Sequence, residues 1–66
     1  MKITVNGEER VLAGDTTLLD LVRGLGLEKS PIAVEVNRAV VPKVRHRETR
    51  LAEGDRLEIV TLVGGG

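Results

Sequence analysis

Residues 56–66 read RLEIVTLVGGG, an alternating strand-like run that leads directly into three consecutive glycines. In the run, Leu57, Ile59 and Thr61 fall on one face, because successive side chains of a strand point to opposite faces. Three glycines add no stability to a domain edge, since ordering glycine costs more backbone entropy than ordering any other residue. Without Cβ atoms, however, they can pass through a channel that is closed to other sequences. We therefore expect a folded domain at residues 1–63 and a flexible tail at residues 64–66.

The other end of the chain has the pattern of a β-hairpin. Residues 1–5 alternate between apolar and polar side chains, and Asn6-Gly7 is a strong signal for a two-residue hairpin turn. We expect the returning strand at residues 9–13. In that strand Leu12 would face the core and Val11 the opposite side of the sheet.

The period changes at Thr17, where the single main helix is predicted to begin. Apolar residues at a helical spacing form one stripe: Leu18, Leu21, Val22 and Leu25. Thr17 is the expected N-cap, with Asp20 as an imperfect capping-box partner, because the box prefers Glu or Gln at that position. Gly24 and Gly26 are candidates for the left-handed residue that ends the helix.

A second pair of strands follows the helix. Residues 32–36 alternate like a strand, Asn37-Arg38 suggests a turn, and residues 39–41 make a short strand. Residues 43–50 are polar and basic, which favours an irregular segment or one short helical turn over the end of the sheet. Leu51 is the expected anchor of that segment.

This order of elements predicts an α+β domain in which one main helix packs across one face of a mixed sheet of four to five strands. The last strand comes after the helix. It is therefore expected to pair with residues 1–5 in parallel and to lie in the centre of the sheet.

Composition narrows the possible functions. The chain has 66 residues, no Cys and no aromatic residue, so one small core of Leu, Ile and Val is expected, without disulfides or thiolate chemistry. Ten basic and ten acidic residues cancel, which argues against a protein that coats nucleic acid or an anionic membrane. No apolar run reaches the length of a membrane span. We expect a cytoplasmic protein that is monomeric when free.

The titratable residues suggest no active site. His46 is the only histidine, no Ser or Cys lies near it, and a solvated surface position is the favoured interpretation. A solvated loop is likewise favoured over a site for an acidic partner or a phosphate at the basic cluster of Lys43, Arg45, Arg47 and Arg50. The acidic residues have no metal-loop spacing. The sequence therefore predicts no catalytic residue, no metal ligand and no bound cofactor.

Two apolar residues near the glycines are less ordinary. Val60 and Leu62 would lie on the sheet face opposite the helix, and Val11 would share that face. Apolar residues on an uncovered sheet face can form a docking patch, although scattered exposed aliphatic side chains are normal in a small protein. Val11, Val60 and Leu62 are the candidate partner-docking patch.

Several motifs together resemble one family. They are the Asn6-Gly7 hairpin, the helix start TTLLDL at residues 16–21, VEVN at 34–37, and LAEGDRLEIV at 51–60 running on to Gly65-Gly66. In this combination the chain resembles the ThiS family, the sulfur-carrier proteins of thiamine biosynthesis. The resemblance covers essentially the whole chain and implies a ubiquitin-like β-grasp fold.

The resemblance also implies a mechanism. In that family a ubiquitin-activating-type enzyme adenylates the C-terminal glycine with Mg-ATP, and sulfur that originates from a cysteine desulfurase converts it to a thiocarboxylate. The carrier then donates sulfur to thiazole synthase. Gly66 matches the modified glycine, and Gly64 and Gly65 match the tail that partners recognise. The carrier itself would be a protein co-substrate and not an enzyme.

Other functions share the same features. The small subunit of molybdopterin synthase has the same fold and tail but is usually longer, so length favours the thiamine assignment. A ubiquitin-like modifier joined to lysines through Gly66 and a sulfur carrier for tRNA thiolation both remain open. A different class, the non-covalent β-grasp binding module, would have an inert tail.

Overall fold

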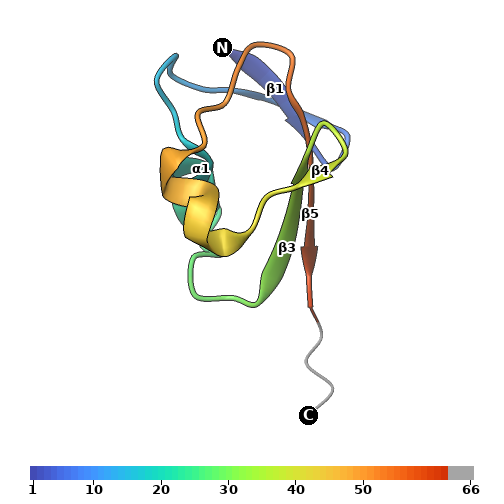
Figure 1. Cartoon of the computed structure of the whole chain (residues 1–66). Coiled ribbons are helices and arrows are strands. Elements are labelled where there is room, and N and C mark those ends of the chain that lie inside the picture. The colour runs from blue at the N-terminus through green and yellow to red at the C-terminus, as the bar shows by residue number, and fades with distance from the viewer. Residues whose placement is uncertain (63–66) are drawn as a thin grey trace.

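A computed structural model describes residues 1–62 of the chain (Figure 1). The elements, in chain order, are β1 (Lys2–Val5), β2 (Glu8–Val11), α1 (Leu18–Gly24), β3 (Ile32–Val36), β4 (Ala39–Val40), the 3₁₀ helix η1 (Lys43–Glu48) and β5 (Arg56–Thr61). The model therefore confirms the predicted order of strands and the single main helix. Val63, which we placed in the last strand, lies outside the described residues.

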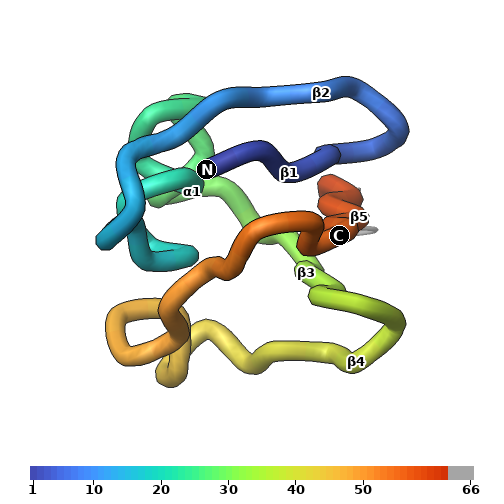
Figure 2. The backbone as a smooth tube through the Cα atoms, turned by 90° about the horizontal axis from the view of Figure 1, so that it is seen from above, coloured from blue at the N-terminus to red at the C-terminus, as the bar shows by residue number. Residues whose placement is uncertain are grey.

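The five strands form one mixed sheet in the order β2-β1-β5-β3-β4. Two antiparallel hairpins, β1–β2 and β3–β4, lie on either side of β5 (Figure 2). β5 runs parallel to β1, with Val5 opposite Leu57, and antiparallel to β3, with Val34 opposite Ile59. The prediction of a central last strand, parallel to the first, is confirmed.

Both hairpins turn on an asparagine with a left-handed backbone. Asn6 and Gly7 have φ of 51° and 80°, and Asn37 and Arg38 have φ of 51° and 70°. Two consecutive residues with positive φ are typical of the type I′ turn, whose twist suits a two-residue hairpin. This turn pairs Val5 with Glu8, so β2 begins and ends earlier than the 9–13 that we predicted.

Helix α1 begins at the predicted cap. The Thr17 hydroxyl accepts a hydrogen bond from the Asp20 backbone N–H at 3.1 Å, and the Thr17 backbone N–H donates to the Asp20 carboxylate at 3.1 Å. Asp20 thus completes the capping box despite being shorter than the preferred Glu. Gly26, with φ of 74°, supplies the left-handed residue after the helix.

The core lies between the sheet and a layer that α1 and η1 form on one side of it (Figure 1). It consists of nine buried aliphatic side chains: Ile3, Val5, Leu18, Leu21, Val22, Val34, Leu51, Leu57 and Ile59. Leu51 is buried, which confirms it as an anchor. Among residues 1–62, no helix is long and apolar enough to cross a membrane.

Candidate functional site

Strand β5 leads to the predicted tail, and its position is fixed as far as Leu62. The Leu62 backbone N–H donates to the Pro31 carbonyl at 2.8 Å, just beyond the pairing of Ile32 with Thr61. Gly64, Gly65 and Gly66, the predicted tail and modified terminus, lie outside the described residues. The structure therefore defines the point from which this segment starts.

Two asparagine side chains hold β5 from opposite sides. The Asn6 amide donates to the Ile59 carbonyl at 3.0 Å and accepts from the Ile59 N–H at 2.8 Å, as a strand residue would. Asn37 accepts from the Arg56 N–H at 3.0 Å and donates to the Asp55 carboxylate at 3.0 Å. Sequence reasoning assigned these asparagines only to turns and missed their contacts with β5. Their position directly after a strand is the one signal that the sequence offers.

The sheet face opposite α1 carries exposed aliphatic side chains near the end of β5. Val60 and Leu62 are about half exposed. Val40 lies on the same face, since it pairs with Glu35 and Glu35 pairs with Glu58. Sequence reasoning did not select Val40, although the short 39–41 strand left it beside the sheet edge.

Val11 shares that face but does not lie beside Val60. Val11 pairs with Lys2 on β1. Lys2 lies two residues before Thr4, and Thr4 is the residue that pairs with Arg56 at the start of β5. Val11 is therefore displaced from Val60 by about six residues along the strands, or roughly 20 Å at 3.3 Å per residue. The structure brings Val60 and Leu62 together and leaves Val11 apart from them.

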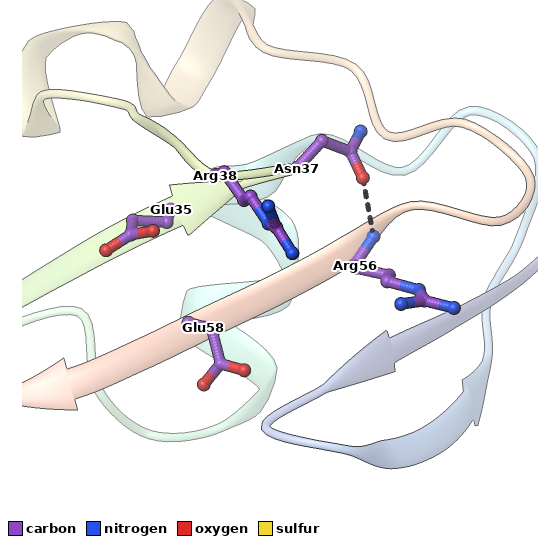
Figure 3. Close-up of a pocket in the computed structure, with 5 residues that line it drawn as sticks. All are labelled: Glu35, Asn37, Arg38, Arg56 and Glu58. Atoms are coloured by element: carbon purple, nitrogen blue, oxygen red, sulfur yellow. Dashed lines mark hydrogen bonds between the residues drawn. The ribbon is translucent and has the colours of Figure 1, made fainter.

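A hollow with charged walls lies on the same face (Figure 3). Its lining residues are Glu35, Asn37, Arg38, Arg56 and Glu58. Glu35 and Glu58 are direct cross-strand partners, an arrangement in which like charges are destabilising. Within residues 1–62, the ion pairs are Lys2–Glu9, Arg23–Glu28 and Arg45–Glu48, so neither carboxylate of the hollow is neutralised by one. The open face thus presents charged and apolar groups side by side, as protein-recognition surfaces do.

The prediction that His46 is a solvated residue is wrong. His46 is buried, and its Nε2 lies 3.0 Å from the Val41 carbonyl oxygen. The reason is that η1 turns His46 inward, while Arg45 and Arg47 on either side remain exposed. Its hydrogen bond satisfies one ring nitrogen, which is the usual requirement for a buried polar group. A structural role accounts for this position.

Across residues 1–62, His, Asp and Glu side chains form no group of three or more that could hold a metal ion. Asp20 is a carboxylate with a clearly lowered pKa, because the Thr17 backbone N–H, and then the Thr17 side chain, stabilise its charged form. Asp20 belongs to the helix cap and lies on the other side of the sheet from the hollow.

With this geometry established, comparison with known proteins identifies the family. The model of the ThiS family matches residues 3–66, which include the three glycines. The chain belongs to the ThiS family. A solved structure of a thiamine biosynthesis protein (ThiS) from Geobacter metallireducens has the same fold, with a TM-score of 0.84, 28% identity and full coverage of both chains.

Two relatives of this ThiS family member differ in length. The sulfur carrier protein ThiS of Bacillus subtilis is 37% identical over 65 residues, which make up 97% of this chain and 98% of that protein. A thiazole synthase of Paramagnetospirillum magneticum is 41% identical over 66 residues, which are all of this chain but 20% of that protein. The chain therefore spans only about a fifth of the length of some relatives.

Proposed function

We propose that this chain is a cytoplasmic sulfur carrier whose Gly66 carboxylate is converted to a thiocarboxylate and supplies sulfur for thiazole formation in thiamine biosynthesis. The observation that carries the proposal is the family match through residue 66, together with the near-complete match in length to the Bacillus subtilis sulfur carrier. The three glycines at 64–66 suit this chemistry, because a segment without side chains can enter a partner's active site.

The proposed chemistry takes place on partner enzymes. A carboxylate is a poor electrophile, so a ubiquitin-activating-type enzyme first joins it to AMP from Mg-ATP and releases pyrophosphate. A persulfide formed by a cysteine desulfurase then attacks the carbonyl carbon and AMP leaves, which gives an acyl disulfide. A partner thiol cleaves its S–S bond, so the chain leaves as the thiocarboxylate and the two partner sulfurs become a disulfide. The chain contributes no base or metal to either step and acts as a protein co-substrate.

Thiazole synthase is the proposed acceptor. Support comes from the relative named thiazole synthase, in which a region similar to this entire chain is part of the same polypeptide. Val60 and Leu62 are the proposed docking residues for both the adenylating enzyme and thiazole synthase, because they are half exposed and lie just before the glycines. The charged hollow beside them would add selectivity, since charge complementarity guides protein association.

Intact-mass spectrometry tests the central step. The full chain is incubated with Mg-ATP, the adenylating enzyme of its own organism and a sulfur donor, and the expected result is a mass gain equal to oxygen replaced by sulfur. Deletion of Gly66 should abolish the gain. A chain with one alanine added after Gly66 keeps a carboxylate in the wrong place and should not be modified either.

The same assay tests the docking residues and the alternatives. The double variant Val60→Ser, Leu62→Ser should slow the modification, whereas Val11→Ser should not, because Val11 lies elsewhere on the face. An unchanged mass for the wild-type chain would contradict the carrier proposal. The appearance of the chain joined to lysines of other proteins would indicate a modifier instead.

A further inference from the structure

A second surface, on the side of the molecule away from the open sheet face, is not used by the proposed function. It is a groove between α1 and η1, lined by Leu19, Arg23, Glu28, Lys43, Val44 and Arg47. Figure 1 shows α1 and the yellow-to-orange coil of η1 together on one side of the sheet. Leu18 donates its backbone N–H to Thr49 at 2.8 Å, which holds the end of η1 against the start of α1.

The groove carries a net positive charge in a protein whose charges balance overall. Residues 43–50 contain four Lys or Arg and one acidic residue, although the whole chain has ten of each charge. The only carboxylate that lines the groove, Glu28, already pairs with Arg23 at 2.9 Å. Neither Lys43 nor Arg47 has an ion-pair partner among residues 1–62. Such separation of charge creates a local field that attracts anionic groups.

The way in which η1 packs is unusual for a helix on a small core. It buries a histidine, His46, and leaves Val44 87% exposed, the highest exposure among the large hydrophobic side chains that the structure describes. Valine is normally the more buried of these two residue types. Natural sequences break such rules chiefly at functional positions. The exposed Val44 and the half-buried Leu19 add apolar surface to the lining of the basic groove.

We propose that this groove binds an acidic segment of a protein that loads or unloads the carrier. An aliphatic side chain of the segment packs between Leu19 and Val44, and its carboxylates contact Lys43 and Arg47. Charge complementarity selects an acidic partner, and the apolar lining favours a peptide with an aliphatic side chain over a simple anion. Because the groove and the open sheet face lie on opposite sides, one partner can hold the groove while the face around Val60 is occupied. The inference rests on the proposed function for the identity of these partners.

Binding measurements with matched variants test the groove. Isothermal titration calorimetry with the full chain gives the dissociation constant for the adenylating enzyme and for thiazole synthase of the same organism. Arg47→Glu should weaken binding to one of them by about tenfold, the effect of losing one charge contact and adding a repulsion. Val44→Ser, which leaves the charge unchanged, should also weaken it.

Arg45→Glu is the control. It makes the same change of charge on the same helix, but Arg45 does not line the groove and pairs with Glu48 at 3.7 Å. This variant should retain binding within about twofold. Circular dichroism should confirm that all three variants unfold at similar temperatures, as substitutions of exposed residues predict.

The outcomes separate failure of this inference from failure of the proposed function. Equal weakening by Arg47→Glu and Arg45→Glu would indicate only diffuse attraction and overturn the groove. Unchanged binding in all variants would leave a solvated surface and overturn it as well. NMR titration with inorganic phosphate tests for a simple anion site. If phosphate binds at Lys43 and Arg47 and Val44→Ser does not change partner binding, the groove inference is also overturned. If the wild-type chain gains sulfur but the groove variants bind their partners as tightly as wild type does, the groove inference fails and the carrier proposal stands.

Discussion

At the scale of single residues, two asparagines determine how firmly the last strand is held. Asn6 and Asn37 both have φ of 51°, a left-handed conformation that asparagine tolerates better than most residues. Their amides then replace the backbone partners that β5 lacks, with hydrogen bonds of 2.8–3.0 Å to Ile59 and Arg56. One residue type thus provides both the turn and the attachment of β5.

Substitution of Asn6 should separate these two roles. Asn6→Gly keeps the left-handed turn but removes both hydrogen bonds to Ile59, at a cost of about 1–3 kcal/mol in the free energy of unfolding. Asn6→Ala removes the same bonds and adds backbone strain of roughly 1 kcal/mol, so it should be less stable than Asn6→Gly. Urea denaturation measures both values. Equal stability of wild type and Asn6→Gly would show that the side-chain bonds contribute nothing.

What could be predicted at this scale followed local rules. The Asn6-Gly7 pair gives the turn because its type depends on the two residues themselves. The contact between Asn6 and Ile59 spans 53 residues, and no local pattern encodes such a distance. His46 was misassigned for a similar reason, since the side of η1 that faces inward is set by packing against α1. The assignment of the glycines at 64–66 as a tail stays a prediction, because they lie outside the described residues.

At the scale of elements, α1 depends on its ends. It has seven residues, far fewer than the roughly 12–15 that an isolated helix needs in water. The capping box gives hydrogen-bond acceptors to two backbone N–H groups at the first turn, those of Thr17 and Asp20. On the inner face of the helix, the side chains of Leu18, Leu21 and Val22 are buried. Both features follow from the sequence pattern, which explains why this helix was predicted with its correct start.

The cap should contribute a stability that depends on pH. The pKa of Asp20 is lowered from its ordinary value of 3.8 by the Thr17 backbone hydrogen bond first and the Thr17 side chain second. A lowered folded pKa means that the contribution is fully present above the unfolded value and is lost as pH falls through the folded value. Asp20→Ala should therefore be less stable than wild type at neutral pH, and the difference should shrink below about pH 3.8.

Thr17→Ala provides the comparison for this experiment. Loss of the cap hydroxyl should cost about 0.5–2 kcal/mol in the free energy of unfolding at neutral pH. Guanidinium denaturation at neutral and acidic pH measures all three proteins. A difference between wild type and Asp20→Ala that stays constant down to acidic pH would argue against the proposed linkage.

At the scale of the whole molecule, a core without aromatic residues holds five strands together. Small domains bury a modest share of their surface, so their stability lies near the lower end of about 5–15 kcal/mol. The general architecture was predictable because the order of elements leaves few arrangements for one small domain. The spacing of Val11 from Val60 was not, since it depends on the register between β1 and β5.

Removal of one central core side chain should be nearly sufficient to unfold the protein. Leu57 is 1% exposed and lies on β5, so Leu57→Ala should cost roughly 2–5 kcal/mol. Val11 is 77% exposed, and Val11→Ala should change stability by less than about 0.5 kcal/mol. Thermal unfolding monitored by circular dichroism compares the two. A Leu57→Ala protein as stable as Val11→Ala would mean that β5 does not organise the core.

The central place of β5 also has a consequence for biosynthesis. The β1–β2 and β3–β4 hairpins share no edge with each other, and only β5 joins them. A nascent chain that lacks residues 56–61 therefore has two separate hairpins and no complete sheet. Long-range pairing of this kind forms late, because the loop between the partners must close first. The sheet can therefore be completed only after residues 56–61 have left the ribosome, whereas each hairpin can pair before then.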